Sequence, residues 1–126
     1  MSLIFDTSVL IDNLRGGTFL QKVLQSLEKK KTLLLPSIVL MEIFSGTSTR
    51  KKEIILKVKK LTELFEKIEL DEIISTRAGI LVRDLEMTLE VPDYIIAATA
   101  LELGASIVTL NKKHFEKIPG ISIYPL

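Results

Sequence analysis

Short apolar runs alternate with segments of helical periodicity along the whole chain. Buried strands are predicted at residues 3–5, 33–35 and 106–110, with weaker strand signals at 68–70 and 121–124. Such alternation predicts a mainly parallel central sheet that is covered by helices on both faces. We therefore expect an α/β fold in a single domain that spans residues 1–126.

Helices are predicted between these strands, where apolar residues recur three or four positions apart. The expected helices cover residues 7–14, 19–31, 38–44, 54–65 and 71–86, and a further apolar helix lies between Pro92 and Gly104. The second of them should end in the lysines of residues 29–31, because cations suit the negative end of a helix dipole. Ser37 and Asp93 are expected to cap the helices that follow them. A loop or short helix is expected at residues 111–117.

Composition restricts the class of protein. The chain has 126 residues, of which 47% are hydrophobic and 26% charged, as is typical of one globular domain. It has no cysteine, which excludes a disulfide framework, a Cys-ligated zinc site and a cysteine nucleophile. Because the chain has no long apolar run and its first residues do not resemble a signal peptide, we expect a soluble, cytoplasmic protein. The net charge of +1 neither requires nor excludes a nucleic-acid partner.

Four polar residues are candidates for a catalytic site. Ligands of open α/β sheets bind beyond the carboxyl ends of the strands. Asp6 and Asn111 directly follow predicted strands, Glu42 lies on the helix after the second strand, and Asp93 opens the helix that leads into the third. The three acidic residues lie in apolar stretches, where an isolated charge is costly, so each is expected to have a partner.

Three converging carboxylates favour a metal ion. Asp6, Glu42 and Asp93 would repel one another at neutral pH, and a divalent cation would remove this repulsion. Oxygen ligands without His or Cys suit the hard ions Mg²⁺ and Mn²⁺. A site of this kind can activate water for the hydrolysis of a phosphodiester bond.

Four sequence blocks resemble those of the PIN-domain nucleases and, among them, of the VapC-type toxins of toxin–antitoxin pairs. The blocks are FDTSVLID at residues 5–12, PSIVLMEIFSG at 36–46, DYIIAATA at 93–100 and VTLNKKHF at 108–115. They follow the family's order and cover nearly the whole chain.

The resemblance implies a PIN-like three-layer α/β/α fold and a Mg²⁺- or Mn²⁺-dependent endoribonuclease. Such enzymes are usually homodimers that a cognate antitoxin holds inactive. Asp6, Glu42 and Asp93 would be the acidic metal ligands. Asn111 would complete the catalytic set, although it stands where many relatives have a fourth acidic residue. The site would therefore be one charge poorer.

Simpler interpretations exist for several single residues. Asp6 and Asp93 could merely cap helices, and Asn111 could be an ordinary turn residue. The only histidine, His114, is expected to be a loop residue that packs near Phe115, with a role as a base or a phosphate contact as the alternative. The hydroxyls of three residues could bond the carboxylates or cap the backbone instead: Thr7, Ser8 and Thr109.

Lysine and arginine residues offer two candidate RNA contacts. Residues 50–52 with Lys57, Lys59 and Lys60 could line an RNA groove, but a solvated helix face is the commoner meaning of such a run. Three other basic residues lie nearer the predicted site: Arg15, Lys112 and Lys113. The apolar stripe between the lysines is expected to belong to the core, with a dimer or antitoxin contact as the alternative: Ile54, Val58, Leu61 and Phe65.

Two other functions remain as alternatives. One is a phosphatase or phosphotransferase with Asp6 as nucleophile, although Ser8 stands where that chemistry commonly has a second aspartate. The other is a catalytically silent PIN-like module that binds RNA or a protein partner. Loss of metal binding in an Asp93→Asn variant would distinguish a metal site from a merely structural carboxylate.

Overall fold

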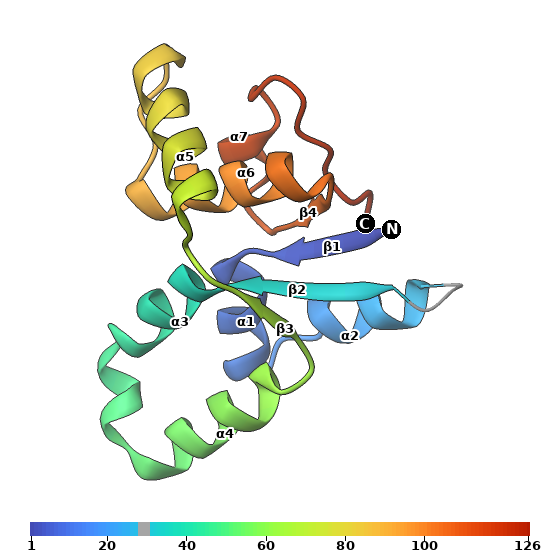
Figure 1. Cartoon of the computed structure of the whole chain (residues 1–126). Coiled ribbons are helices and arrows are strands. Elements are labelled where there is room, and N and C mark those ends of the chain that lie inside the picture. Colours follow the sequence, from blue (N-terminus) through green and yellow to red (C-terminus); the bar gives the residue numbers. More distant parts are fainter. Residues whose placement is uncertain (28–30) are drawn as a thin grey trace.

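A four-stranded parallel sheet forms the centre of the computed structural model, which describes residues 1–27 and 31–126 (Figure 1). The strands are β1 (Ser2–Phe5), β2 (Thr32–Pro36), β3 (Glu66–Ile68) and β4 (Ser106–Val108), in the order β3-β2-β1-β4. Ile4 of β1 pairs with Leu34 on one side and Ile107 on the other. The predicted α/β fold with a parallel sheet is confirmed.

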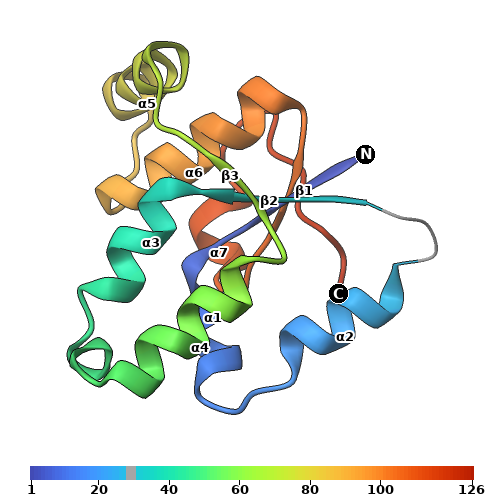
Figure 2. The same ribbon diagram turned by 60° about the horizontal axis from the view of Figure 1, so that its bottom comes forward.

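Helices cover both faces of this sheet (Figure 2). One face carries α6 (Val91–Leu103), which contacts β1, β2 and β4 and packs in turn against α5 (Glu72–Asp84). The other carries α1 (Thr7–Leu14), α2 (Phe19–Ser26) and α4 (Lys52–Thr62). The remaining helical elements are α3 (Ser37–Phe44), the 3₁₀ turn η1 (Thr47–Arg50) and α7 (Lys112–Phe115).

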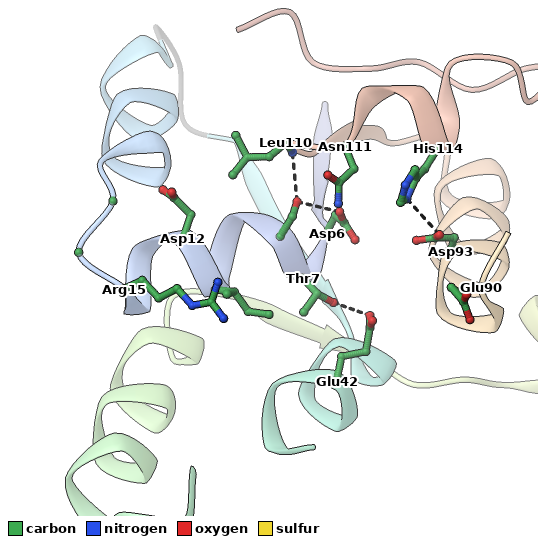
Figure 3. Close-up of a pocket in the computed structure, with 14 residues that line it drawn as sticks. Asp6, Thr7, Asp12, Arg15, Glu42, Glu90, Asp93, Leu110, Asn111 and His114 are labelled. Carbon is green, nitrogen blue, oxygen red and sulfur yellow. Dashed lines mark hydrogen bonds and ion pairs between the residues drawn. The ribbon is translucent and has the colours of Figure 1, made fainter. Parts of the chain in front are cut away.

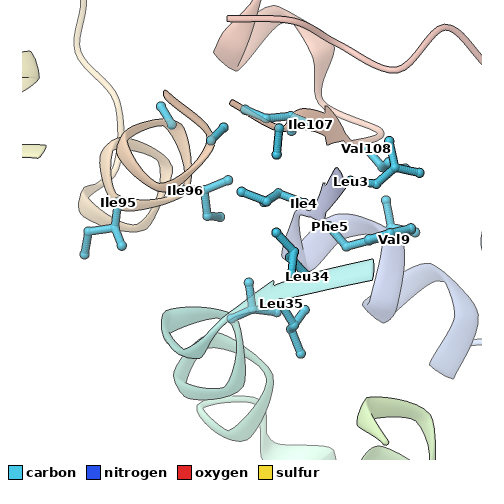
Figure 4. Packing of buried hydrophobic residues seen from close by; sticks show 14 of the residues in the cluster. Leu3, Ile4, Phe5, Val9, Leu34, Leu35, Ile95, Ile96, Ile107 and Val108 are labelled. Carbon is cyan, nitrogen blue, oxygen red and sulfur yellow. The ribbon is translucent and has the colours of Figure 1, made fainter. Parts of the chain in front are cut away.

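The core fills both sides of the sheet. Ile4 and Ile107 point toward Ile96 of α6 (Figure 4), and all three side chains are fully buried. On the other side, Phe5 meets Phe65 edge to face, with ring centroids 4.9 Å apart. The stripe on α4 belongs to this core, as expected, since Val58 and Phe65 are buried and Ile54 and Leu61 pack against them.

The strand order places a switch point between β1 and β4. The chain proceeds outward from β1 to β2 and β3, and then returns to add β4 on the opposite side of β1. The backbone N–H of Asp6 donates to the Val108 carbonyl at 3.0 Å, which joins the carboxyl ends of the two strands. Open α/β sheets bind their ligands at such a point.

Two predicted helix caps are wrong. Helix α3 begins at Ser37 itself, with Pro36 in the capping position. Helix α6 begins at Val91, so Glu90 occupies the cap and Asp93 lies in the first turn. The helix can start before Asp93 because Pro92 has no N–H to leave unpaired and is well tolerated in a first turn.

The predicted last strand is also wrong. Residues 121–124 form only a single parallel bridge, between Ile123 and Ile107. The partner strand β4 is three residues long, and Pro125 has no N–H to extend the pairing.

Two further expectations concern the end of helix α2 and helices that could cross a membrane. Helix α2 ends at Ser26, with Leu27 extended and no basic residue in its last turn, so the expectation that this helix runs to residue 31 is wrong. Lys29 and Lys30 themselves lie outside the described residues. Within the described ranges, every helix is too short or too polar to cross a membrane.

Candidate active site

All four predicted site residues line one open cavity at the switch point (Figure 3). The cavity has a volume of about 730 Å³. Asp6 joins β1 to α1, Glu42 lies on α3, Asp93 lies in the first turn of α6, and Asn111 follows β4. Four segments that are distant in sequence therefore converge, while the catalytic role of their side chains stays a prediction.

Asp6 is held by side-chain hydroxyls and does not act as a helix cap. Its side chain is 4% exposed and makes no capping hydrogen bond, although it precedes α1. The hydroxyls of Ser8 and Thr109 each donate to Asp6 Oδ2 at 2.8 Å. Capping therefore does not explain the position of this buried carboxylate.

The two hydroxyls are themselves oriented by the backbone. The Leu110 N–H donates to Ser8 Oγ at 3.1 Å, and the Asn111 N–H donates to Thr109 Oγ1 at 2.8 Å. Each hydroxyl thus accepts one hydrogen bond while it donates its proton to Asp6. Because both donate to Oδ2, Oδ1 is the oxygen that the described part of the chain leaves for a ligand.

Glu42 is half-buried and is tied to the start of α1. Its Oε1 accepts a hydrogen bond from the Thr7 hydroxyl at 2.5 Å. Burial raises the pKa of Glu42, the Thr7 bond lowers it, and the charges of Asp6 and Asp93 raise it further. The pKa of Glu42 therefore depends on the charges of Asp6 and Asp93 across the cavity.

Asp93 is paired with His114, a contact that the sequence analysis missed. The side chain of Asp93 is 13% exposed, and its Oδ2 lies 3.2 Å from His114 Nδ1. Burial raises the pKa of Asp93, His114 lowers it, and Asp6 raises it again. His114 does pack near Phe115, as expected, but it also lines the cavity. His114 lies three residues after Asn111, about one helical turn, and this spacing could have indicated that His114 lies on the same side as the site.

Three further charged residues line the cavity. Glu90 lies one turn before Asp93, and its charge raises the pKa of Asp93. Asp12 comes from α1, where its carboxylate also accepts the Phe19 N–H at 3.4 Å. Arg15 lines the same cavity, in agreement with the expectation that it lies near the site.

The other basic residues lie apart from the acidic cavity. Lys112 and Lys113 line an adjoining cavity beside Asn111. Lys57 and Lys60 line a separate depression between α1 and α4. Of these candidate RNA contacts, Arg15 is the one that lines the acidic cavity, while Lys112 and Lys113 lie next to that cavity.

The donor atoms fit a divalent cation in their chemistry. Glu42 and Asp93 have raised pKa values partly because the carboxylates repel one another, and a cation would relieve this repulsion. In the described part of the chain, however, no three His, Cys, Asp or Glu side chains are arranged closely enough to hold a metal ion. Binding of Mg²⁺ or Mn²⁺ would therefore have to draw the carboxylates together, and it stays a prediction.

Comparison with known proteins gives a consistent result. The model of the PIN domain matches residues 3–121. The chain is 33% identical to Ribonuclease VapC1 of Methanocaldococcus jannaschii, over 97% of this chain and 86% of that protein. It is 30% identical to Ribonuclease VapC10 of Mycobacterium tuberculosis, over 90% and 85% of the two chains.

Solved structures show the same architecture. A chain in the crystal structure of VapBC2 from Rickettsia felis, bound to a DNA fragment from the promoter, aligns over 98% of both chains with a TM-score of 0.87 and 26% identity. A chain of a toxin-antitoxin complex from Klebsiella pneumoniae aligns over 99% of this chain and 100% of its own length, with a TM-score of 0.79 and 27% identity.

Proposed function

Since the chain belongs to the PIN domain family, we propose that it is a metal-dependent endoribonuclease and the toxin of a toxin–antitoxin pair. The observation that carries this proposal is the convergence of Asp6, Glu42 and Asp93 on one open cavity at the switch point of the sheet. The ribonucleases of similar sequence support the choice of RNA as substrate.

Asp6, Glu42 and Asp93 would provide the oxygen ligands for Mg²⁺, or for Mn²⁺ as its substitute. The bound ion would activate water and stabilise the negative charge that develops on the phosphate oxygens. The chain itself orients the ligands, because Thr7 holds Glu42 while Ser8 and Thr109 hold Asp6. Ligand carboxylates held by such hydrogen bonds lose less freedom when the ion binds.

Two other residues would act on the RNA. Asn111 lines the cavity with a neutral amide that can hydrogen-bond water or a phosphate oxygen. Arg15 extends from the end of α1 into the region of Thr7 and Glu42 (Figure 3), and its guanidinium can bind a phosphate with two parallel hydrogen bonds. It would offset the repulsion between the acidic cavity and the RNA backbone.

An antitoxin protein is the proposed partner, and the homodimer is the proposed assembly. The Rickettsia felis and Klebsiella pneumoniae structures are toxin–antitoxin assemblies, and they align with nearly the whole of this chain. We also propose that the protein acts in the cytoplasm, where RNA is available. Light scattering of the purified chain, alone and with an antitoxin encoded beside it, tests both assemblies.

The decisive experiment is cleavage of mixed RNAs by the purified protein with Mg²⁺, with Mn²⁺ or with a chelator. We expect metal-dependent cutting that falls more than about 100-fold in Asp93→Asn, because losing even an outer-shell partner of a metal site costs roughly 10–100-fold. The control is Glu69→Gln, which removes an exposed carboxylate outside the cavity and should cut normally.

Each other outcome has a clear meaning. Equal cutting by wild type and Asp93→Asn would indicate a contaminating nuclease. If wild type neither cuts RNA nor binds Mn²⁺, the proposal is wrong and the silent binding module becomes the better interpretation.

A further inference from the structure

A second cavity adjoins the acidic one. It has a volume of about 400 Å³, which lies within the range of roughly 300–1,000 Å³ usual for small-ligand sites. Leu110, Asn111 and His114 line both cavities and so form a common rim. Figure 3 shows these three residues side by side along one edge of the acidic cavity. A strand that crosses this rim would therefore occupy both cavities at once.

The chemistry of the second cavity is opposite to that of the first. The described residues that line it include Lys112 and Lys113, both exposed, and His114, but no Asp or Glu. Lys112 Nζ donates one hydrogen bond to a backbone oxygen of Leu126 at 3.1 Å, and a lysine ammonium has three N–H donors in all. Lysines attract phosphates, so this cavity can hold a backbone segment that the acidic cavity alone would repel.

The second cavity also offers apolar surface for a base. Phe19 is partly buried against the core, so its ring is held in place where it lines the cavity. Leu110 and Leu126 add apolar surface and are each 44% exposed. Aromatic rings beside cations are the usual elements of single-strand binding, in which a base stacks on the ring and the cation contacts a phosphate.

We propose that this second cavity binds one unpaired ribonucleotide of the substrate, next to the scissile phosphate, with its base against Phe19 and a phosphate near Lys113. The proposal rests on the proposed ribonuclease function. The site favours single-stranded RNA, because a base inside a duplex is stacked on its neighbours and cannot reach the ring.

Binding is tested in the Asp93→Asn background, with two fluorescent probes of equal length: a single-stranded oligoadenylate and its abasic ribose-phosphate counterpart. We expect Phe19→Ala to weaken oligoadenylate binding about fivefold or more while leaving abasic binding unchanged, because only the former has bases to stack. Lys113→Gln should weaken the binding of both probes equally, and it should lower the salt dependence of that binding by the equivalent of about one phosphate contact.

Matched variants control for folding and for general surface effects. Phe19→Leu keeps apolar packing but removes the aromatic face, so it should show the same selectivity for oligoadenylate. Phe44→Ala removes an exposed aromatic ring, and Lys59→Gln removes an exposed lysine, both outside the two cavities. Neither control should change the binding of either probe.

The outcomes separate this proposal from the proposed function. If Phe19→Ala and Phe19→Leu bind both probes as tightly as the parent, or if they weaken the binding of both probes equally, the proposed nucleotide site is wrong. This holds even if wild type cuts RNA. Selective loss of oligoadenylate binding without any cutting by wild type would support the site and contradict the nuclease. If the parent protein binds neither probe, the nucleotide site is also wrong.

Discussion

Thr109 donates its hydroxyl to the carboxylate of Asp6 at 2.8 Å, although 103 positions separate the two residues in the chain. Both side chains are buried, at 2% and 4% exposure. The bond exists because β4 pairs with β1, which brings the carboxyl ends of the first and last strands together. The orientation of Asp6 therefore depends on the pairing that completes the sheet.

Replacing Thr109 with valine should lower the free energy of unfolding by about 1.5–3 kcal/mol, the usual range for a hydrogen bond to a charged group. Valine has nearly the same shape, so the loss would report the missing hydrogen bonds of the hydroxyl, to Asp6 and from the Asn111 N–H, and not a cavity. Urea unfolding measures it. Thr76→Val, at an exposed position of α5, is the control and should change stability much less. An unchanged midpoint for Thr109→Val would show that Ser8 alone suffices to hold Asp6.

The raised pKa values of Glu42 and Asp93 predict how the stability of the metal-free protein varies with pH. The ordinary values are 4.5 and 3.8, and a raised folded-state pKa means that the native state binds protons more tightly than the unfolded chain. The resulting stability is fully present below the ordinary values and is lost as the pH rises through the raised ones.

Urea unfolding across this pH window, with chelator or with Mn²⁺, measures the effect. In chelator, the free energy of unfolding of Glu42→Gln should fall less with rising pH than that of wild type, while Glu69→Gln should behave like wild type. Mn²⁺ should restore stability above the window and have little effect below it, because the ion binds the ionised carboxylates of the native state. Equal stabilisation by Mn²⁺ on both sides of the window would contradict a carboxylate metal site.

His114 should influence the titration of Asp93. The His114 Nδ1 lies 3.2 Å from Asp93 Oδ2, and His114 lowers the pKa of that carboxyl, which burial raises. We therefore expect His114→Gln to raise the pKa of Asp93 in the metal-free protein, as followed by carboxyl-carbon NMR. Lys113→Gln changes the neighbouring residue and is the control. If the pKa falls or stays constant in His114→Gln, the pair contributes no net electrostatic stabilisation.

Arg15 should contribute to RNA affinity from the acidic cavity. In the Asp93→Asn background, Arg15→Gln is expected to weaken binding of different RNAs by a similar factor and to reduce the salt dependence by about one phosphate contact. The matched control is Arg50→Gln, an exposed arginine of η1 outside both cavities. Equal effects of the two substitutions, in filter-binding titrations at several salt concentrations, would indicate only a general loss of charge.

Local patterns in the sequence predicted most of the architecture. The apolar run before Asp6 predicted β1, and the 3.6-residue periodicity after it predicted α1 with its exact bounds, because burial of one face is a local requirement. Strand ends placed Asp6, Glu42 and Asn111 at one edge of the sheet, and Asp93 was expected to join them if its helix started at the same edge. The structure brings all four to one cavity, in agreement with that inference.

Local patterns were insufficient where a residue's state depends on its neighbours in space. Ser37 and Asp93 have the side chains of helix caps, but each lies next to a proline, and the helices begin at Ser37 itself and at Val91. Residues 121–124 have a strand-like pattern, but a strand also needs a partner of sufficient length, and β4 is short.

The sequence by itself determined the alternation of strands and helices and the fold class, since these depend on hydrophobic periodicity within short segments. It did not determine every strand end, because β3 and β4 end at Ile68 and Val108, two residues before the ends expected for them. Only the tertiary structure decided which polar groups meet. The bonds of Thr7 to Glu42 and of Thr109 to Asp6, and the contact of His114 with Asp93, join residues from different elements. Such pairs arise when the sheet is assembled, because hydrogen bonds and ion pairs require atoms to lie within a few ångströms.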